Sequence, residues 1–260
     1  MKIIGHRGAR GEAPENTLGG FQHIIDLGLK AVEFDVRLLR DGKLAVLHDA
    51  TLQRTAGKPD SLSNLTEQDL GRFDNRQGWQ NWEQSEPIPT LQQTLHLLTG
   101  FEHIEVEVKA VEDQNAVSKI VEQLILELNY WSNVEAVTVT SFDIRILAAL
   151  QQSRIEGKHH LRTGLLLEPK TNSIEQSHLS NESLLQTPEQ QAISLGCSRI
   201  GLSDKLTTES SILTIKNAGL SISIWTVNSP ERAYELEKWQ VDGLITDYPT
   251  QMLKNSIGNI

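Results

Sequence analysis

The chain has 260 residues, which is enough for one (β/α)8-sized domain or two small domains with a large core. Its formal net charge is −10 and its Lys and Arg residues are scattered, which argues against a nucleic-acid partner because duplex binding needs a basic patch. The single cysteine, Cys197, excludes an internal disulfide and a cysteine-based zinc site, and its apolar neighbours predict a buried thiol. No apolar run approaches the roughly 18 residues of a membrane span, and no signal-peptide pattern precedes the first strand-like run. We therefore expect a cytoplasmic protein with no stable membrane insertion.

Strand-like and helix-like stretches alternate along the chain. Helices are expected at 18–27, 116–128, 144–151, 212–218 and 230–238. The first follows Asn16-Thr17, either of which could cap it, and the second has apolar residues at helical spacing. Alternation of this kind predicts parallel strands joined by helical crossovers, and eight such units in 260 residues match a TIM (β/α)8 barrel. Strand counting alone leaves a doubly wound open sheet as the alternative. The expected strands are residues 2–5, 31–36, 104–109, 136–140, 163–167, 199–202, 221–227 and 243–246.

Residues 37–89 separate the second and third of these strands by more chain than one helix requires. Asp41-Gly42 is typical of a hairpin turn, which would return the chain through a short strand at 44–47. We predict a single domain, 1–260, in which 37–89 form a small insertion over the barrel mouth. Trp79 and Trp82 either form a small core within this insertion, which we favour, or wall a substrate pocket. The polar stretch 168–189 predicts a long exposed loop.

Polar and ionisable residues recur at the ends of the strand-like runs, where a TIM barrel collects its active site. Because side chains alternate along a strand with period two, Glu33 and Asp35 share a face, and so do Glu107 and Lys109. Carboxylates, histidines and cations that meet at one rim predict a metal-assisted site for an anion. The residues at or near such ends are His6, Arg7, Glu33, Asp35, His48, Glu107, Lys109, Trp225 and Asp247.

Short motifs accompany these residues in a fixed order along the chain. They are GHRG at 5–8, APENT at 13–17, EFDV at 33–36, HD at 48–49, TLQRT at 51–55, PTL at 89–91, EVK at 107–109, SFD at 141–143, WTVN at 225–228 and DGLITDYP at 242–249. Any one of them would be a weak signal, but the ordered set resembles the glycerophosphodiester phosphodiesterase family, in its bacterial cytoplasmic form. The resemblance runs essentially from end to end. It implies a TIM barrel that hydrolyses glycerophosphodiesters to glycerol 3-phosphate and an alcohol, with a divalent metal.

The resemblance also implies a metal site. Glu33, Asp35 and Glu107 would hold one divalent cation, and hard carboxylate oxygens favour Mg²⁺ or Ca²⁺. The alternative is that these carboxylates form ion pairs with Arg7 or Lys109 across the barrel. Three carboxylates on inward faces would repel one another strongly without a cation, which favours the metal.

His6 and His48 resemble the acid–base pair of the family, and histidine titrates near neutral pH, as both roles require. Arg7 and Lys109 would grip the phosphate, and Trp225 would line the pocket unless it serves ordinary barrel packing. In the implied mechanism the metal lowers the pKa of the 2-hydroxyl of glycerol. One histidine removes that proton and the other protonates the leaving alcohol. Water then opens the resulting cyclic phosphate with the histidine roles reversed.

Residues beside these positions carry further expectations. Asp49 either orients His48 or stabilises its turn, and Glu15 is expected to fix the loop before the first helix rather than to contact the site. Glu105 departs from the family pattern, which more often has a smaller, uncharged polar residue there. Period two places it inward, one layer below Glu107, so that either the strand is locally rotated or Glu105 pairs with an inner cation. The remaining histidines are expected to serve surface or packing roles: His23, His96, His103, His159, His160 and His178.

Two other functions fit parts of the pattern. One is a lysophospholipase D-like enzyme or another phosphodiesterase on the same barrel. Sphingomyelinase D-like and phosphoinositide phospholipase-like enzymes also place two histidines and a metal at this rim. Enzymes of that kind that act at membranes tend to carry apolar interfacial loops, or secretion signals with disulfides, and the sequence has neither feature. A non-catalytic phosphodiester-binding protein would be marked by loss of a histidine or a metal carboxylate, and all are present. The leaving alcohol and the oligomeric state stay open, and residues 50–88 are expected to control the former.

Overall fold

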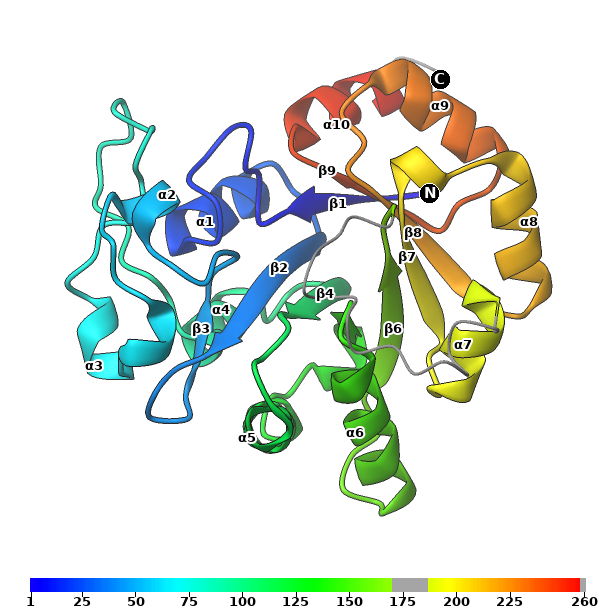
Figure 1. Ribbon diagram of the computed structural model, residues 1–260. Helices are drawn as coiled ribbons and strands as arrows, with labels where there is room; N and C mark the ends of the chain where they lie inside the picture. Colours follow the sequence, from blue (N-terminus) through cyan, green and yellow to red (C-terminus); the bar gives the residue numbers. More distant parts are fainter. Residues whose placement is uncertain (170–186, 258–260) are drawn as a thin grey trace.

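The computed structural model describes residues 1–169 and 187–257, which form a ring of parallel strands surrounded by helices (Figure 1). The strands pair in the order β1-β9-β8-β7-β6-β5-β4-β2, and β1 also pairs with β2, which closes the ring. The closure confirms the predicted TIM barrel and excludes the open sheet. Each strand lies within two residues of its predicted bounds: β1 Lys2–His6, β2 Ala31–Leu38, β4 His103–Val108, β5 Val137–Ser141, β6 Arg162–Leu167, β7 Arg199–Ser203, β8 Ser221–Trp225 and β9 Gly243–Thr246.

Helices on the crossovers cover the outside of the ring (Figure 1). Several begin at a side chain that satisfies a free backbone N–H group of the first turn. Thr17 caps α1 by accepting from Gly20 N at 3.0 Å, and Asp113 caps α5 by accepting from Ala116 N at 2.8 Å. The outer helices are α1 Leu18–Asp26, α4 Leu91–Leu97, α5 Gln114–Asn129, α6 Ile144–Ile155, α7 Pro188–Ser194, α8 Glu209–Asn217, α9 Pro230–Lys238 and α10 Pro249–Ile257.

In strand β2, apolar side chains that pack against the helices alternate with polar side chains that face the inside of the barrel. Val32, Phe34 and Val36 are fully buried in the main hydrophobic cluster, which also contains apolar residues of α1, α4 and α5. Glu33 and Asp35 lie between them in sequence and therefore point to the opposite, inward face. The apolar half of the strand fixes its position against the helices, and the inward half is left for polar groups.

The segment between β2 and β4 contains the predicted hairpin. Strand β3 (Leu44–Val46) pairs antiparallel with the end of β2, with Leu38 opposite Leu44, so the Asp41-Gly42 turn is confirmed. The segment continues through α2 (Gln53–Ala56), the 3-10 turn η1 (Leu62–Asn64) and α3 (Glu67–Leu70). It has a separate small core: Leu39, Ala45, Leu47, Leu52, Leu62, Leu65, Leu70 and Ile88. We refer to residues 37–89 as the insertion.

Trp79 and Trp82 are half-buried within the insertion and meet edge to face, with ring centroids 6.5 Å apart. The indole of Trp82 donates to Glu86 at 2.8 Å, and Glu86 in turn accepts from Gly19 N of α1 at 3.0 Å. These contacts tie the insertion to the barrel. They support a packing role for both tryptophans, as favoured from sequence.

Other expectations concern single residues and segments. Cys197 is 7% exposed, and burial raises the pKa of its thiol to about 11, which confirms a buried structural cysteine. Among the helices of the described residues, none combines the length and apolar character that a bilayer crossing requires. Of the loop expected at 168–189, residues 170–186 lie outside the described residues, as does His178, while Pro188 already begins α7.

Candidate active site

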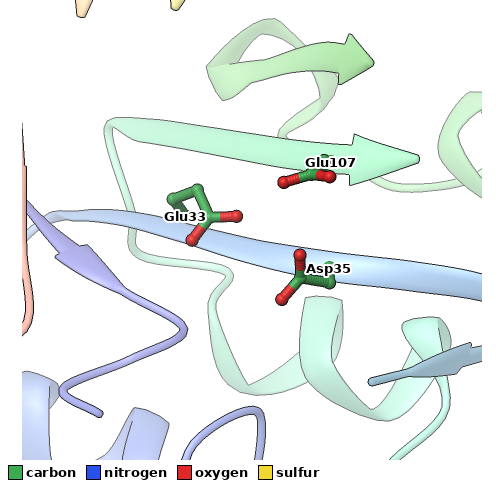
Figure 2. Close-up of side chains that lie close together, drawn as sticks. All are labelled: Glu33, Asp35 and Glu107. Atoms are coloured by element: carbon green, nitrogen blue, oxygen red, sulfur yellow. The ribbon is translucent and has the colours of Figure 1, made fainter. Parts of the chain in front are cut away.

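Three carboxylates meet at the inner face of β2 and β4. Glu33 and Asp35 project from β2 and Glu107 projects from the neighbouring β4, where Asp35 and Glu107 are paired in register (Figure 2). One oxygen atom from each of the three lies within 4.8 Å of the others. Asp35 is fully buried, and the side chains of Glu33 and Glu107 are 7% and 12% exposed. An all-carboxylate set of this kind suits a hard divalent cation.

Charge repulsion within the cluster shows in the pKa directions. Burial, together with Asp35 and Glu107, raises the pKa of Glu33 well above its ordinary value. Burial likewise raises the pKa of Glu107, against the opposing effect of Lys109. Asp35 behaves differently, because the attraction of Arg7 and Lys109 outweighs its burial and lowers its pKa. Two of the three carboxylates are therefore short of positive charge, which a bound cation would supply.

Two buried cations flank the cluster. Arg7 follows β1 with a φ of 50°, and this left-handed turn directs its backbone N–H to Glu33 Oε2 at 3.1 Å. Its guanidinium contacts Asp35 at 3.2 Å and Glu15 at 2.9 Å. Lys109 Nζ lies 3.4 Å from Asp35 Oδ1 and also contacts Glu107. The ion pairs expected as the alternative to a metal site are thus present, and they leave the charge of Glu33 largely uncompensated.

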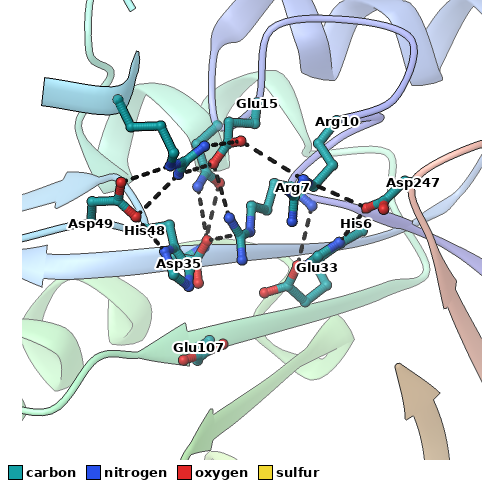
Figure 3. Close-up of polar contacts among 12 residues, drawn as sticks. His6, Arg7, Arg10, Glu15, Glu33, Asp35, His48, Asp49, Glu107 and Asp247 are labelled. Carbon is teal, nitrogen blue, oxygen red and sulfur yellow. Dashed lines mark hydrogen bonds and ion pairs between the residues drawn. The ribbon is translucent and has the colours of Figure 1, made fainter. Parts of the chain in front are cut away.

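Both predicted histidines are held by a carboxylate at Nδ1 (Figure 3). His6 Nδ1 lies 2.6 Å from Asp247 Oδ1, and His48 Nδ1 lies 2.6 Å from Asp49 Oδ1. Burial lowers the pKa of His6 and lowers the pKa of His48 to about 4, although each carboxylate partner opposes the shift. With Nδ1 engaged, each ring has Nε2 for proton exchange, and His6 Nε2 lies 3.9 Å from Glu33. Of the two roles considered for Asp49, the contact favours orientation of His48.

Arg54, in α2 of the insertion, joins the two halves of this network. Its guanidinium donates to both oxygens of Asp49 at 2.7 and 3.1 Å, and to both oxygens of Glu15 at 2.6 and 2.8 Å. Glu15 in turn accepts from Arg7 at 2.9 Å. Arg54 therefore links the carboxylate that holds His48 to the carboxylate that holds Arg7. Glu15 fixes its loop through contacts with two arginines, but the expectation that it does so without contact with the site is wrong, because one of the two is Arg7.

Of these groups, both histidines, both buried cations, Glu33 and Glu107 line one cavity of about 320 Å³, which we call the reaction cavity. Trp225, at the end of β8, forms part of its wall and meets Phe142 edge to face at 5.5 Å. The indole nitrogen of Trp225 is buried without a hydrogen-bond partner, so the ring lies at the cavity without a polar anchor. The cavity is lined by His6, Arg7, Arg10, Glu33, Arg37, His48, Glu105, Glu107, Lys109, Thr140, Phe142, Leu166, Glu168, Trp225, Thr226 and Ile245.

Glu105 lies at the floor of the reaction cavity and has charged partners of its own. His103 Nε2 lies 2.9 Å from Glu105 Oε1, Arg199 of β7 lies 3.4 Å from the same oxygen, and Ser223 of β8 donates to Oε2 at 3.1 Å. Its carboxylate is 1% exposed, yet these partners outweigh burial and lower its pKa. Strand β4 keeps its parallel register through Glu105, which excludes a local rotation of the strand. The other alternative is confirmed, because Glu105 pairs with the inner cation Arg199.

Sequence reasoning missed two members of the network. The sequence marks Asp247 only as a polar residue near a strand end, although it is the partner of His6, and its position within the DGLITDYP motif is the available signal. Arg54 was part of the TLQRT motif without a role of its own. Its function depends on a fold that brings α2 next to the loop after β1, which no spacing in the sequence reveals.

Comparison with known proteins agrees with this geometry. The profile of the Glycerophosphoryl diester phosphodiesterase family matches residues 6–251. A glycerophosphodiester phosphodiesterase of Caldanaerobacter subterraneus subsp. tengcongensis is 27% identical over 251 residues and 96% of each chain. A human protein named lysophospholipase D is 28% identical over 274 residues, which cover 96% of this chain and 84% of its own.

A solved structure shares the fold at lower sequence identity. It is an Oleispira antarctica phosphodiesterase in complex with the product sn-glycerol-3-phosphate, with a TM-score of 0.83 at 21% identity, covering 99% of this chain and 97% of that chain. The family profile matches residues 6–251, nearly the whole chain, and this range includes the residues of both histidine–carboxylate pairs. The chain therefore belongs to the glycerophosphoryl diester phosphodiesterase family.

Proposed function

We propose that the protein is a metal-dependent hydrolase that converts glycerophosphodiesters to glycerol 3-phosphate and an alcohol. The observation that supports this most directly is that two histidines, each held by a carboxylate, line one cavity of about 320 Å³ together with two buried cations and with Glu33 and Glu107 of the carboxylate cluster. That volume suits a small ligand such as a glycerol phosphate group. The relative from Oleispira antarctica, which is described in complex with sn-glycerol-3-phosphate, is consistent with this substrate class.

The phosphate would be held by Arg7 and Lys109. Arg7 offers a planar fork to two phosphate oxygens, whereas Lys109 acts as a point charge. Glu15 and Asp35 fix the position of the Arg7 guanidinium, so little side-chain freedom is lost when an anion binds. The aromatic face of Trp225 would pack against the carbon skeleton of glycerol.

Glu33, Asp35 and Glu107 fit a divalent cation, Mg²⁺ or Ca²⁺, because one oxygen of each lies within 4.8 Å of the others and because burial and the neighbouring carboxylates raise the pKa values of Glu33 and Glu107. When bound, such a cation would polarise the phosphodiester and favour ionisation of the neighbouring glycerol 2-hydroxyl. Lys109 and Arg7 already neutralise Asp35, so the charge supplied by the cation would act mainly on Glu33 and Glu107.

The two histidines would carry the protons. One takes the proton of the 2-hydroxyl at Nε2 as its oxygen attacks phosphorus, and the other gives a proton to the leaving alcohol. Asp247 and Asp49 hold Nδ1 of His6 and His48, which fixes the tautomer and orientation of each ring. A cyclic phosphate results, and water opens it with the two histidine roles exchanged.

The experiment that tests this proposal is release of glycerol 3-phosphate from glycerophosphocholine by chelator-treated protein, with Mg²⁺ or Ca²⁺ restored. His48→Ala should abolish the release, and His160→Ala is the matched control because that histidine is exposed and distant from the reaction cavity. Metal-dependent release that His48→Ala removes would support the proposal. Absence of release from a panel of glycerophosphodiesters with either ion would refute it.

A lysophospholipase D activity is the second candidate, because the human relative carries that name. The same assay with lysophosphatidylcholine, scored by release of choline, separates the two substrate classes. Metal-independent binding of a glycerophosphodiester without turnover would instead indicate a non-catalytic protein. A cytoplasmic location and the absence of a nucleic-acid partner remain predictions.

A further inference from the structure

A second cavity, of about 490 Å³, lies beside the reaction cavity, and of its lining residues only Lys109 has a role in the reaction proposed above. We call it the side cavity. It separates the insertion from the loop between β4 and α5. Its lining comprises Arg37, Leu38, Leu39, Ala50, Leu62, Val111 and Ala116, with Ser61, Ser63, Lys109, Ala110, Glu112 and Asp113.

The two cavities share Arg37 and Lys109. Arg37 is half-buried and donates through Nε to the backbone oxygen of His48 at 2.7 Å. Lys109 is 5% exposed and is fixed by its ion pairs to the carboxylate cluster. Both cations therefore form the boundary between the cavities. A phosphodiester has two ester arms, and a phosphate bound at this boundary would extend one arm into each cavity.

The lining of the side cavity is suited to an uncharged carbon chain. Most of its side chains are aliphatic or alanine, and no aromatic side chain occurs among the described residues that line it. Ser61 and Ser63 hydrogen-bond to each other at 3.0 Å, and Asp113 caps α5, so these polar groups already have partners. A quaternary ammonium group is commonly recognised by aromatic faces, which are missing here. The carboxylates of Glu112 and Asp113 would repel a second phosphate, and because both residues are exposed, solvent screens their attraction for a cationic alcohol.

We propose that the side cavity binds the leaving alcohol of the diester and favours uncharged, apolar alcohols. This inference rests on the proposed function and specifies its substrate class. Each methylene that leaves water for this lining should favour the transition state, since burial of one methylene changes an equilibrium by up to about fourfold. Catalytic efficiency should therefore rise with the length of an alkyl alcohol until the cavity is full.

The test compares sn-glycerol 3-phosphate esters of methanol, butanol and hexanol, with glycerophosphocholine as the cationic comparator. For the full-length, metal-loaded protein we expect kcat/KM to rise by about twofold or more per methylene between the methyl and butyl esters. Ala116→Trp fills the cavity from α5 and should lower the hexyl-to-methyl ratio of kcat/KM by about fivefold or more. Ala50→Trp fills the side cavity from the insertion and should lower the same ratio by a similar factor. Because Ala50 is exposed, this change leaves the hydrophobic core intact.

Ala148→Trp provides the matched control, since Ala148 is an exposed helical alanine on α6 that lines neither cavity. Its hexyl-to-methyl ratio should equal that of the wild type. If every ester is turned over with no chain-length preference, or if both cavity-filling variants keep the preference, the side-cavity inference is overturned and the proposed function is not. A preference for choline over the alkyl alcohols would overturn the side-cavity inference as well. Failure of the wild type to release glycerol 3-phosphate from any ester would overturn the proposed function together with the side-cavity inference.

Discussion

Replacing Glu33 with glutamine tests two properties of the carboxylate cluster separately. The melting temperature without metal reports the repulsion among the carboxylates, and the rise in melting temperature on adding metal reports the affinity of the cluster for the ion. The side chain keeps its shape, and an amide oxygen can still accept the backbone N–H of Arg7 that Glu33 Oε2 accepts at 3.1 Å. The ligand atoms of the cluster lie within 4.8 Å of one another. At that distance two unit charges interact by ~3.5 kcal/mol when the effective dielectric constant is about 20. Each neighbouring carboxylate that stays ionised therefore disfavours the Glu33 charge appreciably.

In chelator, Glu33→Gln should melt at the same temperature as the wild type or higher, because it removes a charge that burial, Asp35 and Glu107 already disfavour. With Mg²⁺ or Ca²⁺ at about 100 times its dissociation constant, the wild type should gain about 2.7 kcal/mol. For a chain of this size that gain corresponds to roughly 5–10 °C in Tm. The variant should show less than about half of this shift, because one of three ligands has lost its charge.

Thermal unfolding followed by circular dichroism, with and without each ion, measures both quantities. Glu122→Gln is the matched control, because Glu122 is exposed on α5 and lies outside the cluster. The reasoning fails if Glu33→Gln melts several degrees below the wild type in chelator, since repulsion would then not dominate the cluster. It also fails if the variant keeps the full metal-induced shift, since Glu33 would then not be a ligand.

Further predictions concern the network around His48 and the buried cysteine. Asp49→Asn should lower kcat about tenfold or more with little change in KM, because His48 loses its orienting partner; an unchanged kcat would refute that role. Arg54→Ala should lower kcat while the free energy of unfolding falls by only about 1 kcal/mol or less, since Arg54 is 44% exposed; Arg54→Lys, which lacks the two-sided fork, should not restore activity. Chiefly through burial, the pKa of His48 falls from 6.5 to about 4, so the native state binds fewer protons than the unfolded state. In urea unfolding with chelator, the wild type should therefore lose more stability than His48→Gln between pH 7 and 5. Iodoacetamide should label Cys197 slowly at pH 8 in native protein and rapidly in urea, because its thiol has a pKa of about 11; equal rates would contradict its burial.

The barrel was predictable because each strand carries a period-two pattern and each crossover a helical one. On β2 the apolar positions Val32, Phe34 and Val36 alternate with Glu33 and Asp35, and both the strand and its inward face follow directly. Closure of the ring was not derivable in this way, because it depends on pairing between β1 and β2, which are separated by a helix, and on β1 pairing with β9 at the far end of the chain. Counting units could favour a barrel but could not exclude an open sheet.

The grouping of the candidate site residues was predictable where those residues lie at the end of a strand. His6 and the carboxylates of β2 and β4 were found because parallel strands bring their C-terminal ends to one rim. The partners that orient the histidines were harder to find. Asp247 is 241 positions from His6, and Arg54 contacts Glu15 across 39 positions. Such contacts are set by packing of loops against one another, and local periodicity carries no information about them.

Glu105 shows why the inward face of a strand does not by itself define a metal ligand. It shares that face with Glu107 and lies one layer below, so alternation treats the two carboxylates alike. Their surroundings separate them. Glu105 has Arg199 at 3.4 Å and His103 at 2.9 Å, and its pKa is lowered, whereas the pKa of Glu107 is raised despite its contact with Lys109. A lowered pKa does not by itself separate Glu105 from the proposed ligands, since Asp35 is also compensated by cations and also has a lowered pKa. Position separates them, because among the described residues the carboxylate oxygens that lie within 4.8 Å of one another belong to Glu33, Asp35 and Glu107. The proposed metal site therefore comprises those three carboxylates, whereas Glu105 links β4 to β7 and β8 through Arg199 and Ser223.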